Sequence, residues 1–286
     1  MPTLLVRYGE IGLKSSRVRK RFEDALVADI RRKHVDAGVQ CLIASQRGRI
    51  FVDSDDWRRS CELLSRTFGV VSFSPATRIE GGLDEIAAAA VAFAEPLISE
   101  GAGFAIRARR SGSHKFTSQN VCERAGAAVL SAYSGKNIKV RLDDPDIEVF
   151  IEVRDRAAYL YSSAIPGPGG MPKGTQGRVL SVVSSSRGVA ATWLLMKRGC
   201  TVVAASEDDD LCARLRAWDA GLRTTPPSGN PFEDAAAYRC HAVALDWDLR
   251  EFESTPTLKG PIPVFYPLVG LLDDDVERLV TRVTRV

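Results

Sequence analysis

The sequence lacks an apolar run long enough to cross a membrane. A bilayer-spanning helix needs about 20 predominantly apolar residues, whereas the alanine-rich stretch 87–94 is followed directly by Glu95 and Pro96. The N-terminal stretch 1–8 has no basic segment before its apolar residues, so it predicts a strand and not a signal peptide. We expect no membrane partner and a cytoplasmic location.

Cysteine pairs with the spacing of zinc ligands are also missing. The six cysteines are scattered along the chain, and no Cys-x-x-Cys motif occurs. This spacing argues against structural zinc, and we expect no metal site. Each cysteine is expected to be a small buried apolar residue. Cys240, beside His241, is the one candidate for a reactive thiol, with the start of a strand as the alternative interpretation.

Positive charge is concentrated at the front of the chain. Residues 1–50 contain eleven Lys and Arg against five Asp and Glu, whereas residues 201–286 contain nine against fifteen. The whole chain has a net charge of only +3. A basic N-terminal part favours a polyanionic partner such as nucleic acid. An ordinary solvated surface is the alternative.

Two domains are predicted before residue 166. Residues 1–76 alternate in the order β-α-β-β-α-β, which is typical of a ferredoxin-like domain. Its elements are expected at 4–8, 16–32, 39–45, 49–52, 55–66 and 70–76. Residues 77–165 predict a second α/β domain, in which Thr117 or Ser118 caps a helix. Its elements are expected at 83–99, 104–109, 118–134, 147–153 and 157–163.

A linker rich in glycine and proline, residues 166–177, is predicted to mark a further domain boundary. In residues 178–286, short apolar strands alternate with helices, which predicts a mostly parallel sheet covered by helices. The strands are expected at 179–183, 200–204, 241–245 and 263–265, and the helices at 189–198, 211–220 and 273–282. Ligands of such sheets bind at the carboxyl ends of the strands.

The turn Ser184–Gly188 follows the first strand of this sheet and precedes a helix. A helix N-terminus presents unpaired N–H groups and a partial positive charge, which suits a phosphate. Three hydroxyls and a guanidinium are good anion ligands. The turn therefore predicts either an anion site or simple capping of the helix by Ser186. The candidate anion-binding residues are Ser184, Ser185, Ser186, Arg187 and Gly188.

Several motifs, in order, resemble a known family. The stretch 7–15 is similar to the opening motif of the tRNA 4-thiouridine sulfurtransferases, or ThiI proteins, and 104–118 resembles the THUMP domain that follows it there. Residues 142–153 and the linker motif 169–175 also resemble family signatures. The resemblance implies an α/β and α+β architecture. It consists of a ferredoxin-like domain (1–76), a THUMP domain (77–165), the linker (166–177) and a truncated Rossmann-like PP-loop domain with a parallel sheet (178–286).

The resemblance also implies tRNA as a partner, because the first two domains of the family together grip tRNA, mainly at the acceptor stem. Basic side chains in both domains agree with phosphate contacts. An RNA duplex is read by its shape and backbone, which suits a basic surface without an aromatic stacking platform. The candidate RNA-binding residues are Lys14, Arg17, Arg19, Lys20, Arg21, Arg107, Arg109, Arg110 and Lys115.

The last domain departs from the family's PP-loop, which binds ATP and adenylates a uridine. The family's Ser-Gly-Gly-x-Asp-Ser motif falls on Val183–Gly188 or one residue away, and in neither register do the paired glycines or the aspartate occur. Between residues 221 and 240 the chain is shorter than the family, and 224–231 is predicted to be a loop that replaces lost helices. The segment that brings the family's catalytic cysteine is missing, so no catalytic residue is assigned.

Two functions follow from these residues. The first is a tRNA-binding protein of ThiI type whose PP-loop domain is degenerate, which has lost ATP-dependent adenylation and needs no cofactor. The alternative is an active tRNA 4-thiouridine sulfurtransferase that uses ATP and magnesium, with or without a catalytic partner protein or sulfur donor. The edges of the ferredoxin-like sheet also leave a homodimer open.

Overall fold

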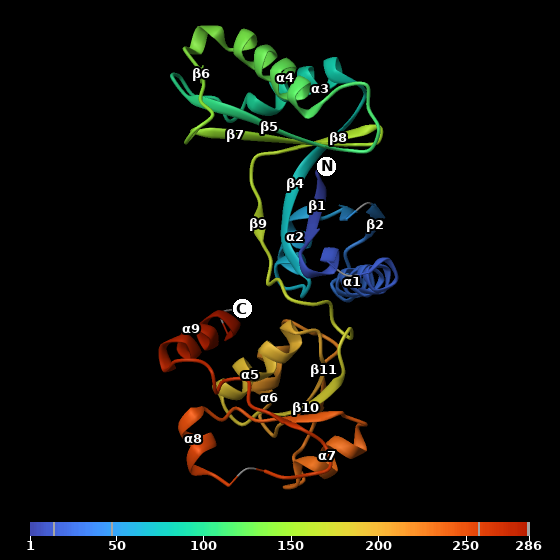
Figure 1. Cartoon of the computed structure of the whole chain (residues 1–286), viewed down its shortest axis with the longest axis vertical. Coiled ribbons are helices and arrows are strands. Elements are labelled where there is room, and N and C mark those ends of the chain that lie inside the picture. The colour runs from blue at the N-terminus through green and yellow to red at the C-terminus, as the bar shows by residue number, and fades with distance from the viewer. Residues whose placement is uncertain (14, 47, 257, 285–286) are drawn as a thin grey trace. The chain divides into compact units, whose positions relative to one another are not determined.

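The computed structural model describes residues 1–13, 15–46, 48–256 and 258–284 (Figure 1). The chain divides into two compact units, and each is described by itself. The first unit consists of Met1–Val6, Gln40–Cys61 and Ser72–Ile165, and the second consists of Arg7–Val39, Glu62–Val71 and Pro166–Val286.

The strands up to residue 166 belong to one mixed sheet. Among the described residues its order is β2-β3-β1-β4-β8-β7-β5-β6, and β9 pairs with β4. The strands are β1 (Thr3–Tyr8), β2 (Cys41–Gln46), β3 (Arg49–Ser54), β4 (Val70–Glu80), β5 (Gly103–Ser111), β6 (Lys139–Val140), β7 (Ile147–Arg154), β8 (Ala157–Tyr161) and β9 (Ile165–Pro166). The helices are η1 (Glu10–Leu13), α1 (Ser16–Asp36), α2 (Trp57–Ser65), α3 (Leu83–Ala94), α4 (Ser118–Ala132) and η2 (Ser134–Lys136). The predicted β-α-β-β-α-β order of the ferredoxin-like domain is confirmed.

Helices α3 and α4 cover one face of β5 and β7 in the first unit (Figure 1). Their buried residues recur at helical spacing, with Ile86 and Ala90 on α3 and Val121 and Ala125 on α4. The helix α4 begins where Thr117 accepts a hydrogen bond from the Asn120 N–H at 3.2 Å, which is one of the two predicted caps. This packing forms an apolar core in the first unit.

The second unit contains a five-stranded sheet in the order β12-β11-β10-β13-β14, and every pair in it is parallel. The strands are β10 (Arg178–Val182), β11 (Thr201–Ala205), β12 (Arg223–Thr225), β13 (Ala242–Ala244) and β14 (Val264–Phe265). The helices are α5 (Ser186–Lys197), α6 (Asp209–Arg216), α7 (Pro231–Ala237), α8 (Leu249–Ser254) and α9 (Asp273–Thr284). The predicted parallel sheet is confirmed.

Three short elements in this unit were not predicted. The segment 224–231 is not simply a loop, because Thr224 and Thr225 pair with β11 as part of β12. Helix α7 then begins at the end of that segment, where the Asn230 side chain accepts a hydrogen bond from the Phe232 N–H at 3.1 Å and Pro231 takes the first helical position. Asparagine followed by proline is a helix-start signal. Helix α8 was also missed.

Several helix ends differ from prediction. Helices α3 and α6 end at Ala94 and Arg216, whereas they were predicted to continue to residues 99 and 220. Helix α1 continues four residues beyond Arg32, because Lys33 and His34 are buried in the second unit and the Lys33 ammonium donates to the Arg66 carbonyl. Burial lowers the pKa of Lys33, and the neighbouring carboxylates Asp29 and Asp219 oppose this. Helix α5 begins at Ser186, three residues before the predicted start, because Ser185 caps it.

The linker is tied down within the second unit. The Gly169 N–H donates to the Val70 carbonyl at 2.8 Å, and the Met171 N–H donates to the Lys197 carbonyl at 2.9 Å. Gly170 has φ +77°, and a Cβ atom there would lie 2.1 Å from the Lys197 carbonyl oxygen. A side chain at Gly170 is therefore excluded both by the backbone conformation and by contact.

An aromatic cluster joins the segment 62–71 to the helices around the parallel sheet. The Phe68 ring lies 5.6 Å from the ring of Trp193 on α5 and 5.6 Å from Trp218, and the two indoles are 5.3 Å apart. The three side chains are 1–8% exposed.

Among the described residues, no helix combines the length and the apolar character of a membrane span.

The Phe68→Ala variant tests this cluster. We expect the free energy of unfolding to fall by about 3–5 kcal/mol, because a buried phenylalanine loses its transfer energy and leaves a cavity. Urea unfolding followed by tryptophan fluorescence measures the change. The control is Phe252→Ala, since Phe252 is 37% exposed and its loss should cost clearly less. Equal effects of the two variants would contradict the assignment.

Candidate functional site

The turn after β10 lies at a strand-to-helix junction, as predicted. Ser185 is the N-cap of α5, and its hydroxyl accepts a hydrogen bond from the Gly188 N–H at 3.1 Å. The cap is thus Ser185, not Ser186. A Cβ atom on Gly188 would lie 3.1 Å from the Val183 Cα and 3.3 Å from the Val182 carbonyl oxygen, so glycine allows the helix start to approach the strand end closely.

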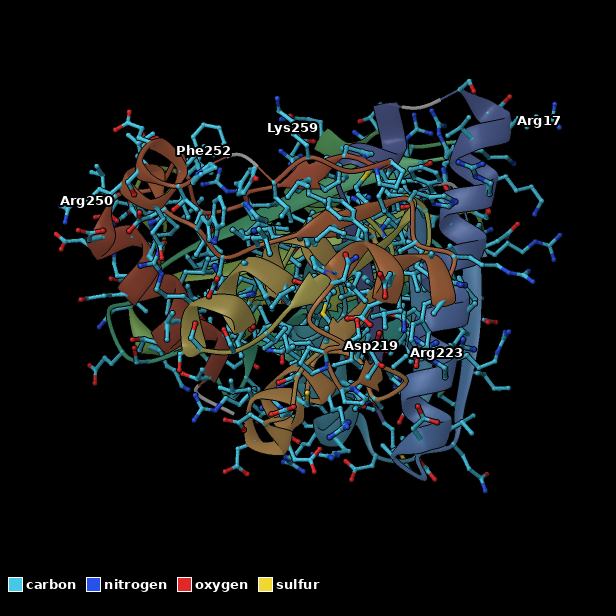
Figure 2. All side chains as sticks on the ribbon, turned by 90° about the horizontal axis from the view of Figure 1, so that it is seen from below. Arg17, Asp219, Arg223, Arg250, Phe252 and Lys259 are labelled. Carbon is cyan, nitrogen blue, oxygen red and sulfur yellow. The ribbon has the colours of Figure 1, made fainter. Side chains whose placement is uncertain are left out.

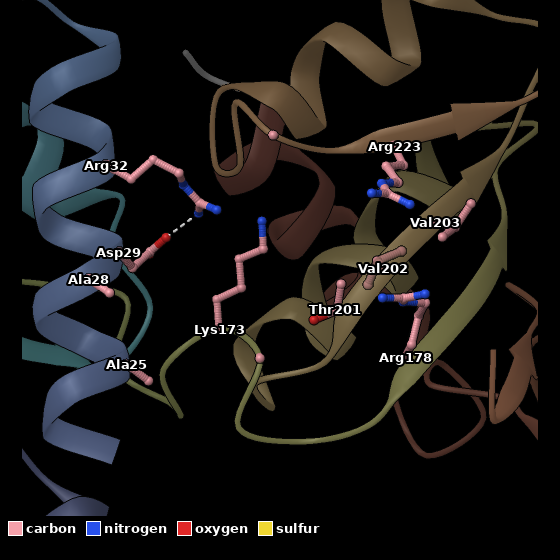
Figure 3. Close-up of a pocket in the computed structure, with 12 residues that line it drawn as sticks. Ala25, Ala28, Asp29, Arg32, Lys173, Arg178, Thr201, Val202, Val203 and Arg223 are labelled. Carbon is pink, nitrogen blue, oxygen red and sulfur yellow. Dashed lines mark hydrogen bonds and ion pairs between the residues drawn. The ribbon is translucent and has the colours of Figure 1, made fainter. Parts of the chain in front are cut away.

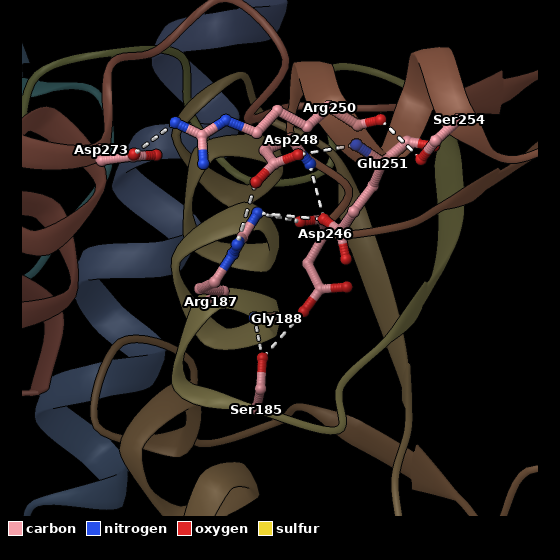
Figure 4. Close-up of polar contacts among 9 residues, drawn as sticks. All are labelled: Ser185, Arg187, Gly188, Asp246, Asp248, Arg250, Glu251, Ser254 and Asp273. Carbon is pink, nitrogen blue, oxygen red and sulfur yellow. Dashed lines mark hydrogen bonds and ion pairs between the residues drawn. The ribbon is translucent and has the colours of Figure 1, made fainter.

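Three acidic side chains that follow β13 reach this turn (Figure 4). The strands β10 and β13 are parallel neighbours, with Ser181 opposite Ala244, so both end at the same edge of the sheet. Asp246 lies two residues beyond β13, and its carboxylate accepts a hydrogen bond from the Ser185 hydroxyl at 2.8 Å. A carboxylate of the chain itself therefore lies beside the helix start.

The guanidinium of Arg187 is engaged by the same segment. It donates to the Asp248 carboxylate at 3.3 Å, to the Glu251 carboxylate at 3.2 Å and to the Asp246 carbonyl at 3.2 Å. The Arg187 side chain is 38% exposed, so each ion pair is worth little by itself. Together they hold the guanidinium beside the start of α8 (Figure 4).

Asp248 also caps α8. Its carboxylate accepts the Glu251 N–H at 2.8 Å, and the Glu251 carboxylate accepts the Asp248 N–H at 2.9 Å. The Glu251 N–H lowers the pKa of Asp248 most, and the Arg187 guanidinium lowers it further. The lowered pKa stabilises the folded chain at neutral pH. This contribution is lost as the pH falls below the usual value for aspartate and through the lowered one.

The remaining residues of the turn are partly engaged as well. The Ser186 hydroxyl accepts a hydrogen bond from the Arg214 guanidinium at 3.2 Å, and Ser184 is exposed. An external anion would have to replace these contacts and approach Asp246, Asp248 and Glu251, with like-charge repulsion of about 1–4 kcal/mol for each carboxylate about 4 Å away. Anion binding at Ser184–Gly188 stays a prediction, and the geometry disfavours it.

Prediction from the sequence missed the three carboxylates as partners of the turn. A signal was present, because Asp246 and Asp248 directly follow the predicted strand 241–245. The carboxyl ends of neighbouring parallel strands meet at one edge of a sheet. What the sequence did not contain is the strand order that makes β10 and β13 neighbours.

Cys240 lies in the apolar core and not at this edge. It is 7% exposed and belongs to a cluster with Leu180, Val203 and Val243. Burial raises the pKa of the Cys240 thiol, as it does for Cys200. A buried thiol with a raised pKa contains little thiolate at neutral pH. The environment of Cys240 is that of a structural cysteine.

The predicted RNA-binding residues fall into two groups, one in each unit. The first group, Arg17, Arg19, Lys20 and Arg21, lies on the first two turns of α1. The residue Lys14 lies outside the described residues. Figure 2 shows Arg17 extending from the start of α1 away from the ribbon. In the described part of the chain, Arg17 has neither a hydrogen bond nor an ion pair.

The N-terminal end of α1 carries positive side chains, which destabilise a helix at this end. Its first turn contains no acidic residue, and the cap Ser15 makes no side-chain hydrogen bond. The N-terminus of a helix is positive, and cations placed there cost typically 0.3–1 kcal/mol each. Arg19 is held by the Gly12 carbonyl at 2.7 Å, and Lys20 by Asp24 at 3.5 Å. The cluster therefore creates a strongly electropositive helix end.

The second group lies on β5 and on the loop after it. The Arg107 guanidinium is already bound within the chain, because it donates to the Glu148 carboxylate at 2.9 Å and to the Leu142 carbonyl at 2.5 Å. Arg110 donates to the Gly112 carbonyl at 3.1 Å. Arg109 and Lys115 are exposed and have no hydrogen bond or ion pair with another described residue. The latter two are the side chains available to an external anion.

Comparison with known proteins agrees with this architecture. Residues 3–74 match the ThiI ferredoxin-like domain and residues 81–163 match the THUMP domain. The fold is thus that of a protein with a ferredoxin-like domain, a THUMP domain and a Rossmann-like parallel sheet. The chain belongs to the ThiI family.

Curated relatives are similar over about 70% of the chain. The "Probable tRNA sulfurtransferase" of Methanothermobacter thermautotrophicus is 41% identical over 212 residues, which are 72% of this chain and 52% of that protein. The protein of the same name from Halobacterium salinarum is 39% identical over 203 residues, which are 70% and 52%. The chain spans about half the length of the curated relatives it matches.

Two solved structures share the fold. The crystal structure of PH1313 from Pyrococcus horikoshii has a TM-score of 0.81 and 28% identity, with 99% of each chain covered. A structure described as a 4-thiouridine synthetase–RNA complex with bound ATP has a TM-score of 0.77 and 20% identity, and covers 99% of this chain and 85% of that chain.

The Arg187→Gln variant tests the carboxylate contacts of the turn. We expect the pKa of Asp248 to rise, but not fully to the usual value, because the Glu251 N–H remains its main hydrogen-bond donor. Titration by NMR of the side-chain carboxyl carbon measures it. The matched control is Arg250→Gln, whose guanidinium contacts Asp273 at 3.6 Å. An unchanged Asp248 pKa in Arg187→Gln would show that the contact does not form in solution.

Proposed function

We propose that this chain is a tRNA-binding member of the ThiI family whose parallel-sheet domain does not carry out ATP-dependent adenylation. The observation that supports the loss is the turn Ser184–Gly188. It lacks paired glycines and an aspartate, and its Ser185 hydroxyl and Arg187 guanidinium are bound to the chain's own carboxylates. A nucleotide phosphate would compete with these internal anions for the same donors.

Support for RNA binding comes from the unpaired cations and from the family. Arg17 at an electropositive helix end, and Arg109 and Lys115 beside β5, are exposed and free for phosphate contacts. The chain contains a THUMP domain, and its curated relatives are named tRNA sulfurtransferases. Phosphate contacts position a protein on RNA without reading sequence, so these residues would grip the tRNA backbone, with the acceptor stem as the expected region.

The second candidate function is an active 4-thiouridine sulfurtransferase, alone or with a catalytic partner or sulfur donor. The observation that favours it is the preserved junction, in which a parallel strand, a tight turn at Gly188 and a capped helix keep the layout of a phosphate-binding site. Under this alternative, ATP and magnesium would bind at the carboxyl edge of the sheet after rearrangement of Asp246, Asp248 and Arg187. A homodimer also stays a prediction.

An assay of ATP-dependent adenylation distinguishes the two candidate functions. We expect the purified chain to release no pyrophosphate from ATP above background when tRNA and magnesium are present, and to form no 4-thiouridine when a persulfide donor is added. Radiolabelled ATP measures the first reaction, and mass spectrometry of digested tRNA nucleosides measures the second. ATP-dependent formation of 4-thiouridine by this chain would overturn the proposed loss.

Charge reversal of the unpaired cations tests RNA binding. In the triple variant Arg17→Glu, Arg109→Glu and Lys115→Glu we expect tRNA affinity to fall by at least about tenfold, and the salt dependence of binding to decrease by about one unit of slope per lost phosphate contact. Gel shifts at two salt concentrations measure both effects. The matched control is Arg239→Glu with Lys259→Glu, two exposed cations of the acidic C-terminal part.

The variant at Arg17 also carries its own stability control. Replacing a cation with an anion in the first turn of α1 should raise the free energy of unfolding by at most about 0.3–1 kcal/mol. The melting temperature should therefore be unchanged or higher. A loss of RNA affinity in Arg17→Glu therefore reflects a lost contact and not unfolding. Unaltered tRNA binding by the triple variant at low salt would contradict the assignment of these residues as phosphate contacts.

A further inference from the structure

A cavity of about 460 Å³ lies in the second unit, at the opposite edge of the parallel sheet from the turn Ser184–Gly188. Its wall includes the first residues of three strands, namely Arg178 of β10, Thr201 of β11 and Arg223 of β12. The turn follows the carboxyl end of β10, whereas this cavity adjoins the amino ends. It is therefore separate from the site described above.

Four cations from separate segments line this cavity. Arg32 comes from α1, Lys173 from the linker, and Arg178 and Arg223 from the sheet. Figure 3 shows the Arg32 and Lys173 head groups between α1 and the strands, and the Arg178 and Arg223 guanidinium groups beside the strands. Cations repel one another, so their convergence has to be compensated either by internal acids or by an external anion.

Internal acids compensate two of the four cations. Arg32 contacts Asp29 and lies 3.7 Å from Asp219, and Lys173 is paired with the other oxygen of Asp219. Both aspartates have side chains only 5% exposed, so these ion pairs are well formed.

The other two cations keep their charge. Arg178 donates to the Tyr238 carbonyl at 2.8 Å, and a carbonyl does not neutralise a guanidinium. Arg223 is exposed, and within the described residues no carboxylate or hydrogen-bond acceptor contacts its guanidinium. The cavity therefore has a net charge of about two positive units in a partly enclosed space.

Small residues keep the cavity open. Helix α1 turns Ala25 and Ala28 toward it, and Gly174 and Gly221 lie on its rim. A Cβ atom on Gly221 would lie 3.8 Å from the Arg32 guanidinium and 3.9 Å from the Lys173 ammonium, so the glycine leaves both cations reachable. The Thr201 hydroxyl adds a neutral hydrogen-bonding group. Apolar walls with a few cationic groups are typical of a site for a phosphorylated ligand.

We propose that this cavity is an anion site, which binds the phosphate of a nucleotide or of an RNA backbone. Arg178 and Arg223 are its direct ligands, because a planar guanidinium donates two parallel hydrogen bonds to phosphate oxygens. Asp29 and Asp219 hold Arg32 and Lys173 in place beside them. This proposal goes beyond the proposed function, which uses the start of α1 and the residues after β5.

A purely structural ion cluster is the competing explanation, and Arg223 distinguishes the two. The contacts of Asp219 with Arg32 and Lys173 connect α1 to the linker without Arg223. A structural cluster would therefore tolerate its loss, whereas an anion site would lose a ligand.

Titration calorimetry of the full chain with inorganic pyrophosphate tests the proposal. We expect saturable binding, weakened by at least about tenfold in Arg223→Gln, because one charge-assisted contact is removed. The matched control Arg239→Gln, an exposed arginine outside the cavity, should bind like the unaltered chain. The melting temperature of Arg223→Gln should be unchanged. Absent binding at millimolar pyrophosphate, or equal affinity of the two variants, overturns the proposal.

Competition with tRNA identifies the source of the phosphate. If pyrophosphate displaces tRNA and Arg223→Gln weakens the gel shift, the ligand is the RNA backbone. If pyrophosphate binds through Arg223 without displacing tRNA, the ligand is a free phosphorylated molecule. Both outcomes support an anion site. The calorimetric titration contains no RNA, so failure of RNA binding by Arg17, Arg109 and Lys115 would leave its result unaffected.

Discussion

The second unit depends on the contact of Phe68 with the two indoles of Trp193 and Trp218. This cluster joins the segment that follows α2 to the helices on the parallel sheet, and buried aromatic rings are among the largest single contributions to packing. Trp193 lies on α5, whose first residues form the strand-to-helix turn. The hydrogen bonds of Gly169 and Met171 then hold the linker in place. The aromatic cluster thus holds α5 at the carboxyl edge of the sheet, and the hydrogen bonds of the linker hold the segment that leads into its amino edge.

At the carboxyl edge, the chain's own side chains occupy the strand-to-helix junction. The Ser185 hydroxyl satisfies the Gly188 N–H, and Asp246 lies where an anion would be attracted by the helix start. Arg187, which is a good phosphate ligand by residue type, is bound to Asp248 and Glu251. A helix N-terminus favours any negative group, whether it is a phosphate or an internal carboxylate. The geometry alone therefore does not imply nucleotide chemistry.

Much of the fold was predictable because its long elements have clear hydrophobic periods. The order of the longer helices and strands up to residue 166 and the parallel sheet after it were both predicted in this way, whereas the two-residue strands β6 and β9 were missed. The strand β12 and the helices α7 and α8 were missed, since segments of three to seven residues are too short to show a period. Helix α1 was predicted too short because Lys33 and His34, polar by type, are buried.

The sequence by itself determined the family architecture, the basic start of α1 and the lack of paired glycines in the turn Ser184–Gly188, since these follow from residue type and local spacing. Tertiary structure alone decided which charges stay available. Arg187 and Arg107 are neutralised by residues 41 to 64 positions away, whereas Arg17, Arg109 and Arg223 are not. Parallel strand pairing brings such distant residues to one edge, and a contact between them leaves no trace in local sequence pattern. The same pairing gathers cations from α1, the linker and β12 around one cavity.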